Sequence, residues 1–269
     1  MADSTESNKP YVIAIANEKG GVGKSTTTLA LGTLLAQRGY KVLLIDLDPQ
    51  ANLTLSLGYK PQQMPPSPGN LAMDGTLFAG DVYPTELENL DLVFARSLIV
   101  NEDHQIQVNT GDDDYFLSQD LEVIARLPYD YVVIDCPPSM GKIATNILLI
   151  SDFLIVPTQA DFFSLYALKN MLAMVGRVRQ VGNPGLIYRI LITLFERRDR
   201  FHRNIRNQLK SMFGVGLFDT FIEVDPELNK TAIQGFPSGN TRGVKQYSKL
   251  LDELLAYIQT VKSSQAYYG

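Results

Sequence analysis

Short apolar runs that end at polar or acidic residues recur along this chain and predict strands alternating with helices. Residues 11–16, 41–48 and 131–135 are nearly continuous in β-forming residues. Continuous apolar strands of this kind are typical of a parallel sheet that is covered on both faces. A strand and turn are expected at 156–163, and a further strand at 186–194.

Segments rich in alanine and leucine predict helices between these strands. The first helix is expected at 25–38, where it stops at Gly39, a natural C-cap. Further helices are expected at 165–180 and 244–262. The core-facing stripe of the last helix consists of Leu250, Leu251, Leu254, Leu255 and Ile258. The alternation predicts an α/β fold, doubly wound, with a mostly parallel sheet and helices on both faces.

Length and composition favour one domain. We expect a disordered polar tail over residues 1–9, a single domain over 10–262 and a C-terminal tail over 263–269. A chain of 269 residues with 45% hydrophobic composition can bury a full core. The chain has no apolar run of bilayer length and no signal-peptide core at its start, which predicts a cytoplasmic protein without a membrane partner.

Three other features of the sequence complete this organisation. The single cysteine, Cys136, cannot form a disulfide within the chain and is interpreted as a small core residue. Residues 61–69 are rich in proline, and residues 101–114 are acidic. We expect both of these segments to be loops.

The most informative motif is Lys-Gly-Gly-Val-Gly-Lys-Ser at 19–25, between the first predicted strand and helix. It departs from the ordinary phosphate-loop pattern because Glu18 stands where that pattern requires glycine. Its glycines leave the backbone N–H groups free to surround phosphate oxygens. Lys24 would reach the β- and γ-phosphates, and the Ser25 hydroxyl would ligate Mg²⁺. The segment expected to bind ATP comprises Gly20, Gly21, Val22, Gly23, Lys24, Ser25 and Thr26.

A second lysine, Lys19, precedes the glycines and is not needed for any of these local roles. Its most economical use is to neutralise phosphate on a facing subunit. The active site would then be complete only in a homodimer formed in the ATP state. Hydrolysis would act as a timer for dissociation, with slow intrinsic turnover.

Three aspartates stand at or just after the ends of predicted strands: Asp46, Asp48 and Asp135. Either strand taken alone could simply end in a helix N-cap. With the phosphate loop present, the three acids predict a site, because ligands of open α/β sheets gather at the carboxyl ends of the strands. Asp135 is placed like the acid that holds Mg²⁺ through water in phosphate-loop NTPases.

Together, the motifs at 19–28, 46–50, 133–139 and 156–160 resemble those of the deviant Walker A ATPases, specifically the ParA branch, over residues 11 to 260. The resemblance implies that Lys19 contacts the partner subunit's nucleotide and that Asp46 and Asp135 act on Mg²⁺ through water. It also implies that Asp48 positions or deprotonates the attacking water. The chain resembles the short form, since its N-terminus leaves no room for an extra helix-turn-helix domain.

The resemblance further implies a sandwich dimer that binds double-stranded DNA without sequence preference and is therefore nucleoid-associated. A ParB-like or cargo-adaptor protein would stimulate hydrolysis and release the DNA, so that plasmid or chromosome cargo is segregated. Asp225 and Pro226 lie where family members contact the adenine base. The sequence just beyond, Leu-Asn-Lys-Thr-Ala at 228–232, departs from the family's usual Leu-x-Glu-Ala.

The charge distribution agrees with a nucleic-acid partner, although the net charge is −5. Residues 176–210 carry a net charge of +7, which leaves −12 for the remainder. Arg203, Arg206 and Lys210 would share one face of a helix. The candidate DNA-binding residues are Arg197, Arg198, Arg200, Arg203, Arg206 and Lys210. The alternative, a solvated helix face, is commoner for an isolated charge run, and the resemblance shifts our interpretation toward DNA.

Other functions share such a loop. A membrane-recruited ATPase of the MinD branch would need a basic amphipathic C-terminal helix, and a nitrogenase-type reductase would need cluster cysteines; neither is present. An ATP-dependent metabolic synthetase stays open, although it would not require the arginine segment. Positioning of a protein assembly, such as an organelle-like shell or a receptor cluster, also stays open, because the partner chooses the cargo.

Overall fold

The computed structural model describes residues 9–60, 82–94, 126–138, 141–231, 235–237 and 239–268. The expected loops at 61–69 and 101–114 lie outside the described residues, as do most of the expected N-terminal tail and Ser139 of the third motif.

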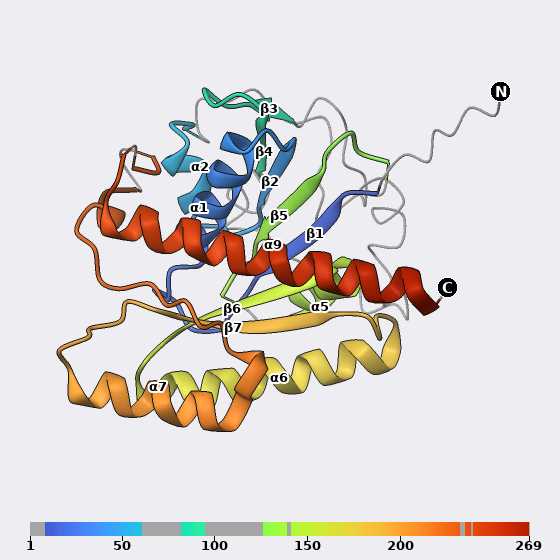
Figure 1. The fold of residues 1–269 in the computed structure, drawn as a ribbon. Helices are drawn as coiled ribbons and strands as arrows, with labels where there is room; N and C mark the ends of the chain where they lie inside the picture. The colour runs from blue at the N-terminus through green and yellow to red at the C-terminus, as the bar shows by residue number, and fades with distance from the viewer. Residues whose placement is uncertain are drawn as a thin grey trace, which may run out of the picture.

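A seven-stranded sheet forms the centre of the molecule, in the order β3-β4-β2-β5-β1-β6-β7 (Figure 1). Every neighbouring pair is parallel except β3 with β4. The strands are β1 (Tyr11–Ile15), β2 (Val42–Asp46), β3 (Tyr83–Pro84), β4 (Leu90–Phe94), β5 (Tyr131–Asp135), β6 (Phe153–Gln159) and β7 (Ile187–Thr193). The prediction of a doubly wound, mostly parallel α/β fold is confirmed.

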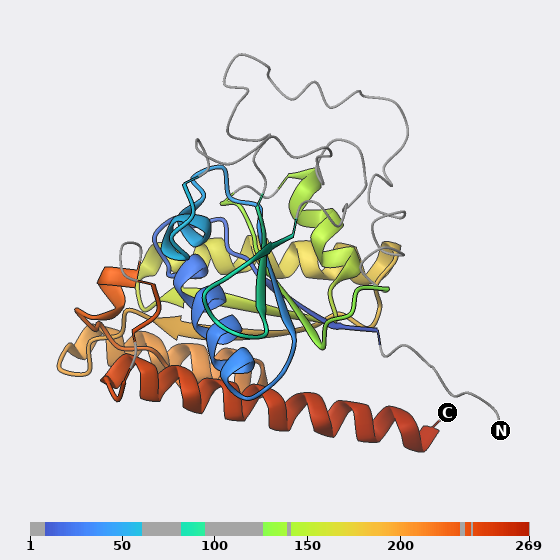
Figure 2. The same cartoon turned by 90° about the horizontal axis from the view of Figure 1, so that it is seen from above.

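Helices cover both faces of this sheet, and Figure 2 shows α9 and α5 on opposite sides of it. One face packs against α1 (Lys24–Gln37) and α9 (Arg242–Tyr268), and the other against α5 (Lys142–Ile150), α6 (Phe162–Val181) and α7 (Arg200–Phe213). Within the described residues, the other helical segments are α2 (Asn52–Ser56) and two 3₁₀ turns, Gly214–Gly216 and Leu228–Lys230.

Alternate residues of the central strands enter two separate cores. In β1, Val12 and Ala14 belong to the core beneath α5, α6 and α7, whereas Ile13 and Ile15 belong to the core beneath α1 and α9. The side chains of β2 and β5 alternate in the same way. Burial on both faces explains why these strands read as continuous apolar runs rather than alternating ones.

The helix boundaries differ from expectation at two places. The last helix begins at Arg242 and continues to Tyr268, so residues 263–268 extend it instead of forming a separate tail. Its expected stripe is confirmed, since Leu250, Leu251, Leu254 and Ile258 are buried and Leu255 is partly buried.

Helix α6 begins at Phe162, three residues earlier than expected, because Asp161 caps it by accepting a hydrogen bond from the Ser164 N–H. Among the described residues, no helix combines the length and apolar character needed to span a bilayer.

The close contact between α1 and β2 gives a test of this packing. A Cβ atom at Gly32 would lie 2.5 Å from Cδ2 of the fully buried Leu44, whereas one at Gly176 of α6 would meet no heavy atom within 4 Å. We expect Gly32→Ala to lower the free energy of unfolding by about 1–2 kcal/mol through overpacking. Gly176→Ala should raise it by about 0.5–1 kcal/mol through helix propensity.

Urea denaturation of the two variants beside the wild type measures both changes. A gain in stability for Gly32→Ala would contradict the tight packing of α1 on β2.

Candidate active site

The carboxyl ends of the parallel strands bring the predicted site residues to one edge of the sheet. Asp46 and Asp135 occupy paired positions at the ends of the neighbouring strands β2 and β5. The phosphate loop follows β1, which lies between β5 and β6. The expectation that these acids and the loop share an edge is therefore confirmed.

The loop has the conformation that its glycines were expected to allow. Gly21 and Gly23 have φ angles of 71° and 82°, in the left-handed region that favours glycine. A Cβ atom at Gly20 or Gly21 would meet no heavy atom within 4 Å, so the backbone is open on that side. Helix α1 begins at Lys24 without a side-chain cap, which leaves its first N–H groups for a ligand. This arrangement fits an anion at a helix N-terminus.

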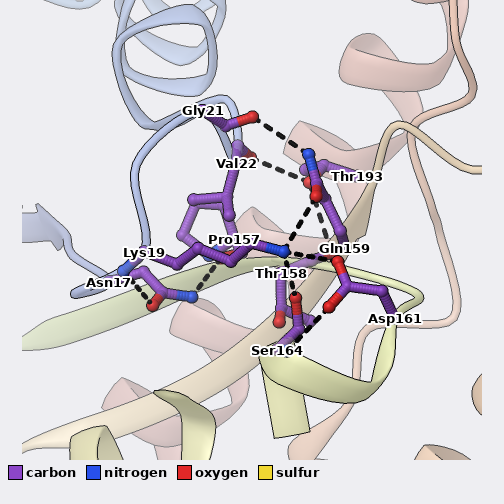
Figure 3. Close-up of polar contacts among 10 residues, drawn as sticks. All are labelled: Asn17, Lys19, Gly21, Val22, Pro157, Thr158, Gln159, Asp161, Ser164 and Thr193. Carbon is purple, nitrogen blue, oxygen red and sulfur yellow. Dashed lines mark hydrogen bonds and ion pairs between the residues drawn. The ribbon is translucent and has the colours of Figure 1, made fainter. Parts of the chain in front are cut away.

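Polar side chains at the ends of β6 and β7 hold the loop through hydrogen bonds to its carbonyl groups (Figure 3). The Thr193 hydroxyl donates to the Val22 carbonyl at 2.8 Å, and the Gln159 amide donates to the Gly21 carbonyl at 3.1 Å. Asn17 donates to the Pro157 carbonyl at 2.7 Å and accepts from the Lys19 N–H at 3.0 Å. The sequence reasoning assigned no role to these residues, although their position at strand ends was a usable signal.

Lys24 is buried behind the loop, with 6% of its surface exposed. Its ammonium group donates to the Lys19 carbonyl at 3.3 Å. Burial lowers the pKa of Lys24, while the negative charges of Asp135 and Asp48 act in the opposite direction. Lys24 is therefore buried within the site, near two of the three acids.

Asp46 is tied into the protein through both carboxylate oxygens. Its Oδ2 accepts from the N–H of Thr54 at 2.9 Å and from the Thr54 hydroxyl at 2.6 Å, and its Oδ1 accepts from the Asp48 N–H at 3.2 Å. Asp48 accepts in turn from the Gln50 N–H at 2.9 Å. Asp46 thus fixes the turn that carries Asp48.

Asp135 differs from Asp46 because it is fully buried and, among the described residues, neither of its oxygens makes a well-aligned hydrogen bond. Its interactions with the Ser25 hydroxyl and with Lys24 lower its pKa, but they do not offset the burial. Burial first, and then the negative charge of Asp46, raise its pKa well above the ordinary value. A buried carboxylate without a well-aligned hydrogen bond needs an explanation, and a bound cation is one of the few available. In the described part of the chain no three acidic, histidine or cysteine side chains converge to bind a metal directly.

Lys19 makes its side-chain contacts within its own chain. The ammonium group donates to Gln159 Oε1 at 3.1 Å and to Ser164 Oγ at 3.2 Å, and it forms an ion pair with Asp161 (Figure 3). All three acceptors come from the end of β6 and the start of α6. The sequence reasoning identified Lys19 but did not find these partners.

Asp225, one of the two residues expected to contact adenine, makes hydrogen bonds within the chain. Asp225 is buried, and its two oxygens accept hydrogen bonds from the N–H groups of Gly243 at 2.6 Å and Glu227 at 2.9 Å. This carboxylate therefore stabilises the start of α9. Pro226 is exposed. An adenine contact by either residue stays a prediction.

The basic segment does form a helix, α7, but several of its side chains have partners within the chain. Arg206 stacks over Phe221 with a separation of 4.8 Å, and Lys210 pairs with Asp219 at 3.1 Å. Arg197 pairs with the buried Glu223, and Arg203 donates to the Arg197 carbonyl at 2.7 Å. Arg198 and Arg200 are exposed, and among the described residues they form no hydrogen bond or ion pair.

Several known proteins are similar to this chain over most of its length. Residues 10–188 match a family model described as an AAA domain. The chain is 34% identical to the chromosome partitioning protein ParA of Caulobacter vibrioides over 255 residues, covering 93% of this chain and 95% of that protein. A putative plasmid partition protein from Borrelia burgdorferi, bound to AMPPNP, superposes with a TM-score of 0.76 at 28% identity, over 93% of this chain and 100% of that one.

A third similar protein has a different activity. Cobyrinic acid a,c-diamide synthase from Mycobacterium smegmatis, with bound ADP and magnesium, superposes with a TM-score of 0.72 at 27% identity. The alignment covers 93% of this chain and 96% of that one.

Burial of the acids predicts how stability depends on pH without nucleotide or metal. Burial raises the pKa of Asp46 to about 6, against the hydrogen bonds from Thr54 and Asp48, and burial also raises the pKa of Asp135 well above its ordinary value. A carboxyl group with a higher pKa in the folded state binds more protons when folded, so its contribution to stability falls as pH rises through that interval. We expect the melting temperature in chelator to fall from about pH 4 to about pH 6 through Asp46, and Asp135 should add a loss in the same direction as pH rises.

Asp135→Asn should raise the free energy of unfolding at pH 7 by about 1–3 kcal/mol and flatten the pH dependence, because it removes a buried charge. Thermal unfolding from pH 5 to 8 in chelator measures both effects. Asp252→Asn removes a carboxylate from the exposed face of α9, where it pairs with Arg38 at 2.7 Å. This matched control should change the free energy of unfolding by less than about 1 kcal/mol and leave the pH dependence as it is. A less stable Asp135→Asn protein at pH 7 would show that the contacts of Asp135 with Lys24 and Ser25 outweigh the cost of burying its charge, and would contradict this account.

Proposed function

This chain belongs to the ParA-type family of P-loop ATPases, and from that premise we propose that it is an ATP-dependent dimerisation switch that binds DNA. In this proposal two copies enclose two ATP molecules, bind double-stranded DNA without sequence preference and dissociate after slow hydrolysis. A ParB-like or cargo-adaptor protein stimulates hydrolysis. The cargo is a plasmid or chromosome, and the protein works in the cytoplasm on the nucleoid.

The observation that carries the proposal is that the two lysines of one phosphate loop, Lys24 and Lys19, lie in different surroundings. Lys24 is buried after the glycines of the loop, near Asp135 and Asp48. Lys19 lies on the other side of the glycines, and its side chain is partly exposed. A positive group placed outside its own phosphate cradle is suited to a nucleotide held by a facing copy.

ATP and Mg²⁺ fit the residues that are present. The open backbone at Gly20 and Gly21 and the uncapped start of α1 would hold the phosphates. The Ser25 hydroxyl, with Asp135 through water, would hold Mg²⁺, which neutralises phosphate charge when bound. Asp46, whose oxygens already accept three hydrogen bonds, would act mainly by fixing the turn that carries Asp48.

Asp48 is our candidate for orienting the attacking water. It is buried at the site edge, and one of its oxygens accepts the Gln50 N–H. Phosphoryl transfer needs little more from a protein than positive charge, correct positioning and one group that orients water. The chain supplies these with Lys24, Lys19 and Asp48.

DNA binding rests on the exposed arginines at the start of α7. We name Arg198, Arg200 and Arg203 the α7 basic surface. They contribute three charges that no acidic side chain of the described residues pairs. Arginines placed in this way bind phosphate oxygens without reading sequence. A dimer would present the surface twice, which links DNA affinity to the nucleotide state.

Two other functions have some support. The similarity to cobyrinic acid a,c-diamide synthase favours a metabolic synthetase as a second candidate, at 27% identity. The α7 basic surface is the feature that such an enzyme would not need. Positioning of a protein assembly uses the same switch with a different adaptor, so it differs from the main proposal only in the cargo.

Retention on nonspecific duplex DNA tests the proposed function. We expect retention with ATP and Mg²⁺, little with ADP or without nucleotide, and a large drop in retention when salt rises from about 50 to about 200 mM. Turnover with and without DNA is measured in parallel. Absence of retention in every nucleotide state would contradict the proposal and favour a metabolic ATPase.

Arg198→Ala combined with Arg200→Ala tests the α7 basic surface. We expect weaker DNA binding, with the slope of log affinity against log salt reduced by about 0.9 for each DNA phosphate that the variant no longer binds. Nucleotide binding and dimerisation should not change. Lys41→Ala combined with Lys60→Ala removes the same charge just before β2 and in the segment after α2, and this variant should bind DNA like the wild type. Equally weakened binding in both double variants would show that only net charge matters.

A further inference from the structure

Three successive carbonyl groups of the phosphate loop each accept a hydrogen bond from a side chain. The carbonyls and their donors are Gly21 with Gln159 at 3.1 Å, Val22 with Thr193 at 2.8 Å, and Gly23 with Thr27 at 2.7 Å. The C=O and N–H groups of a trans peptide point in opposite directions, so each of these bonds aims the next N–H group away from its donor. The N–H groups that would surround a phosphate are therefore oriented before a nucleotide binds.

The third donor, Thr27, is itself held by the C-terminal helix α9, which packs against α1 (Figure 1). The hydroxyl of Tyr247 on α9 lies 3.0 Å from the Thr27 hydroxyl. A threonine hydroxyl has one proton, and Thr27 uses it on the Gly23 carbonyl, so Tyr247 donates and Thr27 accepts. Two consecutive hydrogen bonds thus connect α9 with the carbonyl group at the start of α1.

We propose that Tyr247 is a positioning residue for the phosphate loop, which acts through Thr27 to fix the Gly23 carbonyl and aim the Lys24 N–H at the phosphates of the nucleotide. Tyr247 itself does not touch the nucleotide. The proposal concerns nucleotide binding by a single chain, and it depends on neither dimerisation nor DNA.

Burial makes this pair of hydrogen bonds hard to replace. Tyr247 and Thr27 are 1% and 0% exposed, so bulk water does not reach either hydroxyl. Burial raises the pKa of Tyr247, which therefore keeps the proton that it donates. Hydrogen bonds in such surroundings are stronger than in water, and each polarises the next. The Tyr247 hydroxyl therefore restrains the direction in which the Thr27 hydroxyl points.

Gly23 is the position in the loop where such a restraint has most effect. It has φ 82° and ψ 29° and precedes α1 without a side chain that could cap the helix. Glycine has the largest backbone freedom of any residue, so the peptide between Gly23 and Lys24 depends on contacts from outside the loop. A threonine that donates to the carbonyl four residues earlier is common in helices. The additional feature here is the tyrosine that orients this threonine.

The simpler explanation is that Tyr247 donates to Thr27 only to satisfy its own buried hydroxyl. Removal of the Tyr247 hydroxyl would then leave nucleotide binding unchanged, because Thr27 could still donate to the Gly23 carbonyl. The proposal predicts a loss of nucleotide affinity instead. The two explanations therefore differ in one measurable quantity, the affinity of the loop for phosphate.

Tyr247→Phe removes the hydroxyl and keeps the ring, which lies edge-on to Phe236 with 6.1 Å between centroids. We expect the Kd for ADP with Mg²⁺, measured by isothermal titration calorimetry, to rise about twofold to tenfold. Tyr257→Phe is the matched control, because it removes a hydroxyl from the same helix where the ring stacks on Arg189. Its Kd should equal that of the wild type.

Variants of Thr27 test the route of the effect. Thr27→Val removes the hydroxyl that connects Tyr247 with Gly23, so Tyr247→Phe should not raise the Kd further in that background. Thr27→Ser keeps the hydroxyl, and in that background Tyr247→Phe should raise the Kd as it does in the wild type.

Hydrogen exchange reads the loop without any nucleotide. The Thr27 N–H donates to the Gly23 carbonyl at 2.9 Å, so a looser carbonyl should speed exchange of the Thr27 amide. We expect a rate about twofold to tenfold higher in Tyr247→Phe than in the wild type or Tyr257→Phe. The amide of Val133, in the centre of β5, reports on the stability of the whole domain and should exchange at the same rate in all three proteins.

Several results would overturn the positioning role of Tyr247. An unchanged Kd in Tyr247→Phe, an equal rise in Tyr257→Phe, or a rise that persists in the Thr27→Val background would each do so. Equally faster exchange at Thr27 and Val133 would show a general loss of stability and would overturn it as well. A chain that binds ADP but neither dimerises nor binds DNA with ATP would contradict the proposed switch alone.

Discussion

Parallel pairing of β5 with β1 on one side and β2 on the other is the constraint on which the site depends. Because parallel strands end at the same edge, the phosphate loop after β1, Asp46 at the end of β2 and Asp135 at the end of β5 meet there. The pairing is held by apolar side chains that enter a core on each face. A shift of one residue in β5 would move Asp135 away from Asp46 and turn it toward the other face.

Two buried carboxylates at the same edge of the sheet, Asp46 and Asp135, lower the stability of the free protein. Asp135 is buried and makes no well-aligned hydrogen bond among the described residues, and Asp46 lies at the paired position on the next strand. Lys24 is a compensating charge close to this carboxylate, and it is itself desolvated. A bound cation would offset the negative charge of these carboxylates and restore that stability. Stability and ligand binding are therefore coupled, as is usual for sites with perturbed carboxyl groups.

The fold and the phosphate loop could be predicted from the sequence because their signals are local. Continuous apolar strands indicate a covered parallel sheet, and the glycines before Lys24 indicate a phosphate loop. The partners of Lys19 and the internal contacts of Arg206 and Lys210 could not be predicted in this way. Asp161 lies 142 residues from Lys19 in the sequence, and Phe221 and Asp219 come from segments that only tertiary packing brings to α7. Asp225 shows the same limit, since its carboxylate stabilises α9 rather than standing free for a base.

Whether the active site is completed by a second copy is tested most directly by mixing two inactive variants. Lys19→Ala lacks the second lysine, and Asp48→Ala lacks the group that orients water. If Lys19 acts on the facing subunit's nucleotide, a mixed dimer contains one complete site, and an equimolar mixture should recover up to about a quarter of the wild-type ATPase activity. If Lys19 acts only within its own subunit, every site in the mixture lacks one group. An inactive mixture in which sedimentation detects mixed dimers would contradict the two-chain site.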